Sequence, residues 1–193
     1  MRSELSHYLK TVAAAALLVG VNQSIQAQSI LQNGGFETGD FTGWNTVNKS
    51  EFLSVDDGSS SLFIPYDGSY YALFGGSGDS IDQAVVTTPG AAYDISYSLN
   101  ASYATSDILV SWDGAPLSSL TSYNSGQVNN GWVNFDFQVT ASSALTDLAF
   151  TYNNGPAMGI DDVSITSVPE PSTLALAGLG SLALLVLRHR RVC

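Results

Sequence analysis

Residues 28–168 contain no cysteine and no histidine, because Cys193, His7 and His189 all lie nearer the ends of the chain. Without these side chains the segment cannot build a Ser-His-Asp triad, a Cys-His nucleophile, or a zinc site with His or Cys ligands. Disulfide bonds are excluded as well. The stability of a fold in this segment must therefore come from its core or from an oxygen-ligated ion.

Basic residues are almost absent from the same segment. Lys49 is its only basic residue, whereas 15 of the 17 acidic residues of the chain lie there. Such a surface repels phosphate backbones, which argues against a nucleic acid as partner. An acidic, lysine-poor domain stays soluble and attracts cations.

The first 27 residues have the layout of a secretory signal peptide. Arg2 and Lys10 precede an apolar run from Val12 to Val21, and Ala27 supplies a small residue at the end. A run of about ten residues is too short for a stable membrane anchor, which needs about 20. We therefore predict a signal peptide over 1–27 with cleavage after Ala27; a buried N-terminal helix is the alternative.

The chain ends in an uncharged apolar segment, residues 172–187, followed by Arg188, Arg190 and Arg191. The arginines would lie on the cytoplasmic side of a membrane under the positive-inside rule. The predicted transmembrane helix over 172–187 is short for a bilayer, so it is a marginal anchor suited to removal. A buried helix is the alternative.

Residues 168–193 resemble the PEP-CTERM sorting signal of Gram-negative bacteria. The resemblance rests on the motif that precedes the apolar segment, on that segment, and on the arginine cluster; the motif is Val168-Pro169-Glu170-Pro171. It implies that an exosortase, an integral-membrane cysteine protease, recognises the motif, cleaves near it and releases the protein from the inner membrane to the outside. Cys193 departs from tails that end in arginine, and it is either lipidated or incidental.

Residues 28–167 predict one all-β domain, a sandwich or a barrel. Apolar and polar residues alternate in 93–99 and in 132–139, and Ile108, Val110 and Trp112 share one face of a third segment. Such alternation places one side of each strand inward. We expect eight or nine strands in two antiparallel sheets. Turns are predicted at five glycine pairs: Asp57-Gly58, Asp67-Gly68, Pro89-Gly90, Asp113-Gly114 and Asn154-Gly155.

The same region resembles galactose-binding-like modules, which include carbohydrate-binding modules and choice-of-anchor surface proteins. The resemblance is carried by short motifs in a fixed order, from the opening Asn33-Gly34-Gly35-Phe36-Glu37 through 68–73, 81–83 and 88–93 to the closing Gly159-Ile160-Asp161-Asp162-Val163. It implies an antiparallel jelly-roll β-sandwich. It does not specify a ligand, because one fold hosts many functions.

A structural calcium ion is the cofactor that this second resemblance implies. Related modules hold Ca²⁺ where a glutamate of the opening motif meets an aspartate of the closing motif, which here implies Glu37 and Asp161. Carboxylates and backbone carbonyls are the ligands that Ca²⁺ requires. The alternative is that these acids cap turns or face solvent.

Sugar binding needs exposed aromatic rings that stack on the faces of pyranoses, with polar side chains beside them. Strand parity places Trp112 in the core, and Trp44 belongs to the opening motif and is expected in the core as well. Trp132 is the tryptophan expected at the surface. We take it as a candidate ligand-binding residue, together with Tyr66, Tyr103 and Tyr123 near predicted loops. The alternative is that these aromatics only pack.

The two adjacent acidic pairs, Asp56-Asp57 and Asp161-Asp162, are not predicted to form a glycosidase site, because neighbouring residues on a strand point to opposite faces. Distant carboxylate pairs remain open. The sequence thus favours an exported, non-enzymatic cell-surface or extracellular-matrix protein that contacts exopolysaccharide, since the sorting system commonly accompanies exopolysaccharide production. The alternatives are a structural biofilm-matrix protein without a specific glycan and, less favoured, a carboxylate-dependent glycoside hydrolase.

Overall fold

The structure, a computed structural model, describes residues 28–59, 62–101, 105–117, 123–124 and 131–169. In these ranges it holds eleven β-strands, more than the eight or nine expected, because some short segments also pair. The strands are β1 (Asn45–Val47), β2 (Ser54–Asp56), β3 (Tyr71–Phe74), β4 (Ser80–Val86), β5 (Ala92–Ala101), β6 (Thr105–Trp112), β7 (Ala115–Pro116), β8 (Tyr123–Asn124), β9 (Val133–Thr140), β10 (Leu145–Asn154) and β11 (Met158–Ser167).

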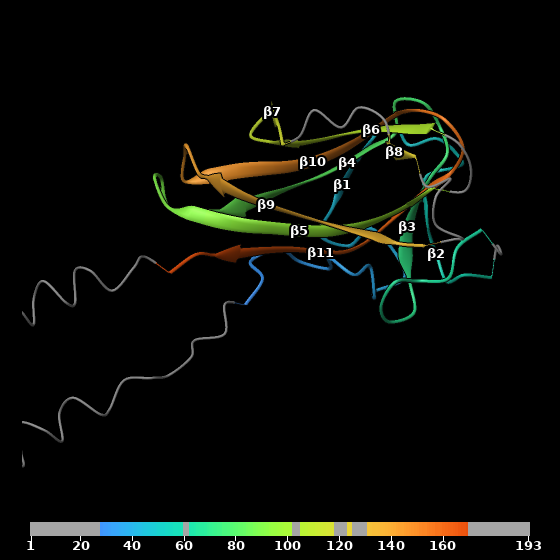
Figure 1. Cartoon of the computed structure of the whole chain (residues 1–193), viewed down its shortest axis with the longest axis horizontal. Helices are drawn as coiled ribbons and strands as arrows, with labels where there is room; N and C mark the ends of the chain where they lie inside the picture. Colours follow the sequence, from blue (N-terminus) through green and yellow to red (C-terminus); the bar gives the residue numbers. More distant parts are fainter. Residues whose placement is uncertain (1–27, 60–61, 102–104, 118–122, 125–130, 170–193) are drawn as a thin grey trace, which may run out of the picture.

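The strands form two antiparallel sheets that pack face to face (Figure 1). One sheet has the order β1-β4-β10-β6-β7, with β8 also paired to β6, and the other has the order β2-β3-β11-β5-β9. Figure 1 shows β4 and β10 as one layer, with β5 and β11 as the other. The predicted all-β sandwich with two antiparallel sheets is confirmed.

The predicted alternation decides which side chains form the core. Ile95 and Tyr97 of β5 and Val110 of β6 are at most 5 % exposed, and they lie between the sheets. Phe135 and Phe137 of β9 face the same way but are only partly buried. These two side chains are only partly buried because β9 lies at the edge of its sheet, where it pairs with β5.

The five predicted turns are confirmed by their backbone angles. Each glycine of these pairs has a positive φ, from 62° at Gly68 to 121° at Gly155. Residues with a Cβ adopt this region at a cost, so the glycines are needed for the chain to reverse there.

The opening motif packs against β11. Phe36 is fully buried and stacks on Trp44, with ring centroids 5.6 Å apart. Gly34 runs so close to β11 that a Cβ atom there would lie 1.9 Å from the Val163 carbonyl oxygen. The Val163 amide donates a hydrogen bond of 3.0 Å to the Gly34 carbonyl. Only glycine permits this approach, which brings the opening and closing motifs together.

The sorting motif begins where β11 ends. The Val168 amide donates to the Ala92 carbonyl at 2.9 Å, and Pro169 is exposed. Several predictions lie outside the described residues: the signal peptide 1–27, Glu170, Pro171, the helix over 172–187, and Arg188, Arg190 and Arg191. Among the residues that are described, no helix is long and apolar enough to cross a membrane.

Candidate functional site

An aromatic cluster lies on the outer face of the five-stranded sheet. Ala72 and Phe74 of β3 belong to the core, so the alternate residue Tyr71 points outward. The Trp132 ring covers it, with centroids 5.8 Å apart, and Phe63 lies 6.2 Å from Trp132. Gly159 of β11 makes room for this tryptophan, because a Cβ atom there would lie 2.8 Å from Trp132 Cη2.

Hydrogen bonds hold the partly exposed members of this cluster in place. Trp132 Nε1 donates to the Ile64 carbonyl at 2.8 Å, and Asn134 Nδ2 donates to the Tyr66 hydroxyl at 2.8 Å. The rings of Tyr66 and Trp132 lie 6.1 Å apart at 62°. Tyr66 is 41 % and Ile64 82 % exposed, and both line a hollow of about 430 Å³ with Trp132. We call Ile64, Tyr66 and Trp132 the aromatic rim.

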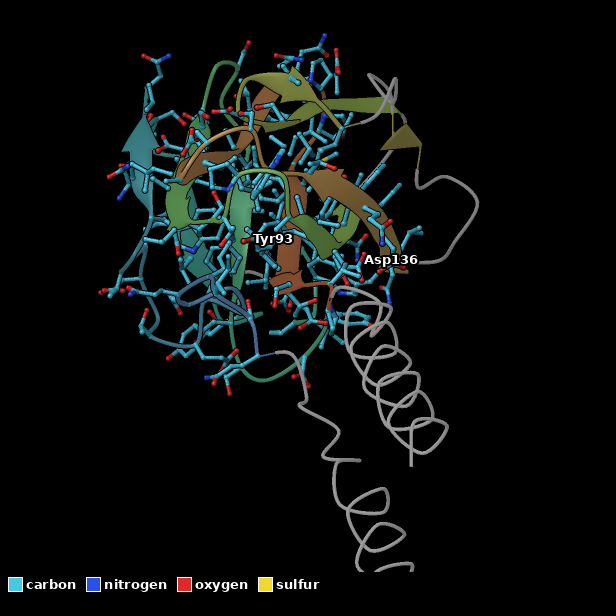
Figure 2. All side chains as sticks on the ribbon, turned by 90° about the vertical axis from the view of Figure 1, so that its left-hand side faces the viewer. Tyr93 and Asp136 are labelled. Atoms are coloured by element: carbon cyan, nitrogen blue, oxygen red, sulfur yellow. The ribbon has the colours of Figure 1, made fainter. Side chains whose placement is uncertain are left out.

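A polar groove continues from the aromatic rim along β9. Two hollows of about 390 and 140 Å³ lie there, and Asp136 lines both. Figure 2 shows Asp136 at the outside of the sandwich, whereas Tyr93 lies near its middle. We call this surface the β9 groove. Its polar side chains come from β5, β9 and β11: Asp94, Ser96, Ser98, Asn134, Asp136, Gln138 and Asp162.

The β9 groove is ordered by cross-strand pairs. Ser98 faces Asn134, and its hydroxyl donates to Asn134 Oδ1 at 2.9 Å. Asp94 faces Gln138, whose Nε2 donates to Asp94 Oδ1 at 3.1 Å. Asn134 thus links the groove to the aromatic rim, because its amide nitrogen binds Tyr66.

Negative charge dominates the β9 groove. The pKa of Asp162 is raised by burial and by the nearby carboxylate of Asp67. Lys49 is the only basic residue in the described part of the chain, and its ammonium lies 5.5 Å above the Phe41 ring, outside the groove lining. The groove offers hydrogen-bond acceptors and amides without a basic side chain.

The structure unites two of the four predicted ligand-binding residues. Trp132 and Tyr66 touch, and Trp132 is the most exposed of the three tryptophans, since Trp44 and Trp112 are 6 % and 5 % exposed. Tyr123 belongs to β8, whose backbone pairs with β6 on the other sheet. Tyr103 lies outside the described residues.

Sequence reasoning missed Ile64, Phe63 and the polar residues of the groove as site residues. The polar residues had a usable signal, because Asn134 and Asp136 occupy every second position after Trp132 and therefore share its face. Ile64 and Phe63 had none, since only the folded loop brings them over β3.

Glu37 and Asp161 hold the same loop from two sides. The carboxylate of Glu37 accepts hydrogen bonds from the amides of Ser69 and Tyr70, at 2.9 and 3.1 Å. Asp161 Oδ2 accepts from the Tyr66 amide at 2.8 Å and the Asp67 amide at 3.2 Å. Asp161 is fully buried, and burial raises its pKa to about 7. The two carboxylates therefore fix the loop that carries Tyr66.

These residues fit a hard cation in their donor chemistry. Both offer carboxylate oxygens, and Glu37 Oε2 and Asp161 Oδ1 each accept a single amide hydrogen bond, which leaves a lone pair for a cation. Asp161 is a buried carboxyl group, and a bound cation would offset the desolvation of its ionised form. In the described ranges no three or more acidic, His or Cys side chains converge on one point, so backbone carbonyls or water would complete such a site.

The parity argument against a glycosidase pair fails at Asp161 and Asp162. The register between β11 and β5 shifts between Asp161 and Ser164, and Asp162 has a φ of 51°, so the strand bulges there. Burial gives a better reason, since Asp161 is inaccessible and bound to amides. Asp56 accepts a hydrogen bond from the Gly58 amide, and Asp57 from the Ser59 amide, as turn residues do.

Comparisons with known proteins agree with both resemblances. The family described as "PEP-CTERM protein-sorting motif" matches residues 167–191. No curated protein matches the chain. The solved structure of TmCBM61 in complex with β-1,4-galactotriose is similar, with a TM-score of 0.59 and 19% identity over 74% of this chain and 100% of that one.

Two further solved structures share the fold. The CBM22-1 xylan-binding domain of Paenibacillus barcinonensis Xyn10C has a TM-score of 0.56 and 17% identity, over 77% of this chain and 100% of that one. CBM35 from the same organism has a TM-score of 0.50 and 16% identity, over 67% and 96%. The chain thus carries a PEP-CTERM protein-sorting motif after a β-sandwich that shares its fold with these carbohydrate-binding modules.

Proposed function

We propose that this protein is a non-enzymatic surface or matrix protein that binds exopolysaccharide through the aromatic rim and the β9 groove. One observation carries the proposal: Trp132 and Tyr66 are held by hydrogen bonds at one end of a groove lined with polar side chains. The carbohydrate-binding modules that share the fold support it.

The chemistry of the site suits a sugar chain. Aromatic faces attract the C–H surface of pyranose rings, while amide and carboxylate groups bind hydroxyls. Trp132 and Tyr66 are already oriented by Ile64 and Asn134, so little side-chain freedom is lost on binding. The β9 groove extends this contact along the strand, over several sugar residues.

The experiment compares binding to soluble exopolysaccharide fragments by affinity electrophoresis. Trp132→Ala and Asn134→Ala should weaken binding at least about tenfold, because the first removes the stacking ring and the second removes the amide that orients Tyr66. Phe52→Ala is the matched control, because Phe52 is 59 % exposed and does not line the groove. Equal binding by all three variants would refute the site.

Export and processing form the second part of the proposal. The sorting motif at 167–191 indicates an exported, exosortase-processed protein. We propose that the predicted helix over 172–187 anchors the chain briefly in the inner membrane before cleavage. Mass spectrometry of protein from the cell exterior should give a mass that runs from Gln28 to the region of Pro171. An intact chain from Met1 in the cytosol would contradict this.

The non-enzymatic assignment is tested separately. The assignment is supported by the similar solved structures, which are carbohydrate-binding modules. Incubation with chromogenic glycosides should release no product. Turnover that a single Asp136→Asn change abolishes would establish a hydrolase instead.

We also propose that Glu37 and Asp161 bind a structural Ca²⁺. The support is the burial of the Asp161 carboxyl group and the contact of both side chains with one loop. The ion would supply positive charge beside Asp161 and would stabilise the loop that carries Tyr66. Calcium removal should therefore lower both stability and glycan affinity.

A further inference from the structure

Resting on the proposed function, we propose that the β9 groove selects glycans without acidic groups and prefers those that carry amino groups. The observation behind this proposal is the sign of the charge along the groove, together with the uncharged nature of the aromatic rim at its end.

Two exposed carboxylates face the middle of the groove from neighbouring strands. Asp94 of β5 is paired with Gln138, and Asp136 of β9 is paired with Ser96, so the two aspartates are diagonal neighbours on one face. Diagonal neighbours on antiparallel strands lie about 7 Å apart, within reach of one sugar ring. A sugar held in the groove would therefore meet both carboxylates.

Asp162 adds a third carboxylate at the 140 Å³ hollow that Asp136 also lines. No basic side chain offsets these charges, because Lys49 is the only basic residue among the described ones and contacts Phe41 instead. An arriving uronate would meet like charge along the whole groove, whereas an ammonium group would meet opposite charge.

The aromatic rim makes no such distinction. Trp132, Tyr66 and Ile64 are uncharged, and Trp132 and Tyr66 are held by hydrogen bonds to Ile64 and Asn134. Stacking on these rings depends on the sugar face and not on its charge. We therefore assign stacking affinity to the aromatic rim and charge preference to the aspartates of the β9 groove, so a substitution can change one without the other.

The test measures three oligosaccharide hexamers by titration calorimetry, with the full chain purified in mild detergent at about pH 6, where amines are protonated and carboxylates ionised. The probes are β-1,4-linked glucosamine, its N-acetylated counterpart and α-1,4-linked galacturonate. We expect glucosamine to bind roughly fivefold to tenfold more tightly than the acetylated chain, the size of two exposed ion pairs. Galacturonate should not bind measurably, and high salt should abolish the preference for the amine.

Charge variants complete the experiment. The double variant Asp94→Asn with Asp136→Asn should lose most of the preference for the amine, because only Asp162 then remains, whereas Glu51→Gln, an exposed acid outside the groove, should keep the preference. Trp132→Ala should weaken binding of the amine and of the acetylated chain alike. Binding of galacturonate as tight as that of glucosamine, or a preference that survives the double variant, would overturn the inference. If no probe binds the wild-type chain, the proposed function fails as well.

Discussion

Asp161 should make this protein less stable as the pH rises towards neutrality. The carboxyl group is fully buried, and its pKa is raised from 3.8 to about 7. Between these two values the folded chain keeps a proton that the unfolded chain has lost. The stabilisation is therefore complete below about pH 4 and is lost as the pH rises through about 7.

The magnitude follows from the same pKa. A rise from 3.8 to about 7 corresponds to about 4 kcal/mol of unfolding free energy, at about 1.4 kcal/mol for each pH unit. Asp147 and Asp162 act in the same direction, because burial raises their pKa values too. A protein with a total stability of about 5–15 kcal/mol would show this loss clearly.

Urea unfolding in EDTA at pH 5 and pH 8 provides the assay. We expect the unfolding free energy to be about 3 kcal/mol lower at pH 8, the part of the effect that falls above pH 5, and Asp161→Asn should remove most of the difference, because the amide does not titrate. Glu51→Gln, an exposed acid, serves as the control for the number of acidic groups. Stability that increases from pH 5 to pH 8 in the wild-type chain would refute the burial argument.

The same unfolding experiment, repeated with Ca²⁺ in place of EDTA, tests the calcium proposal. A bound cation stabilises the ionised form of Asp161, so Ca²⁺ should restore stability at pH 8 much more than at pH 5. With free Ca²⁺ at about 100 times its dissociation constant, the gain is about 2.7 kcal/mol. Identical unfolding curves in EDTA and in Ca²⁺ would remove the calcium proposal while leaving the pKa argument intact.

Three other substitutions test the geometry. Gly68→Ala should lower the free energy of urea unfolding by about 3 kcal/mol, because its Cβ would lie 2.3 Å from Glu37 Oε1. Gly114→Ala is the control, since Gly114 has a similar φ with open space around it, and it should lower the same free energy by about 1 kcal/mol. Gly159→Ala should displace the Trp132 ring and weaken glycan binding about tenfold; unchanged affinity would disprove the packing role of Gly159. Phe36→Ala should cost about 3–5 kcal/mol, and a loss below 1 kcal/mol would contradict its place in the core.

Local patterns were enough to predict the sandwich. The strict alternation within 93–99 of β5 and along β9 and the glycines at the turns depend on neighbours in sequence, so the sequence displays them directly. The short strands β7 and β8 were not foreseen, since two residues carry no periodicity and pair only because the rest of the sheet is present.

The site could be predicted only in part. Trp132 was identified because its parity on β9 opposes that of Val133 and Phe135. Its contact with Tyr66 depends on the path of the loop after β2, which is set by the distant carboxylates Asp161 and Glu37. Parity also misled at Asp162, where a bulge interrupts the strand, because alternation assumes a regular backbone.

The aromatic rim and the sorting motif lie at opposite ends of β11. Gly159 at one end lies under Trp132, whereas Ser167 at the other pairs with Tyr93 and is the first residue of the matched sorting motif. Eight residues of extended strand separate them, a distance of about 26 Å. A domain attached through Val168 would hold the aromatic rim at the end away from the attachment point, where it could contact a surrounding polymer layer.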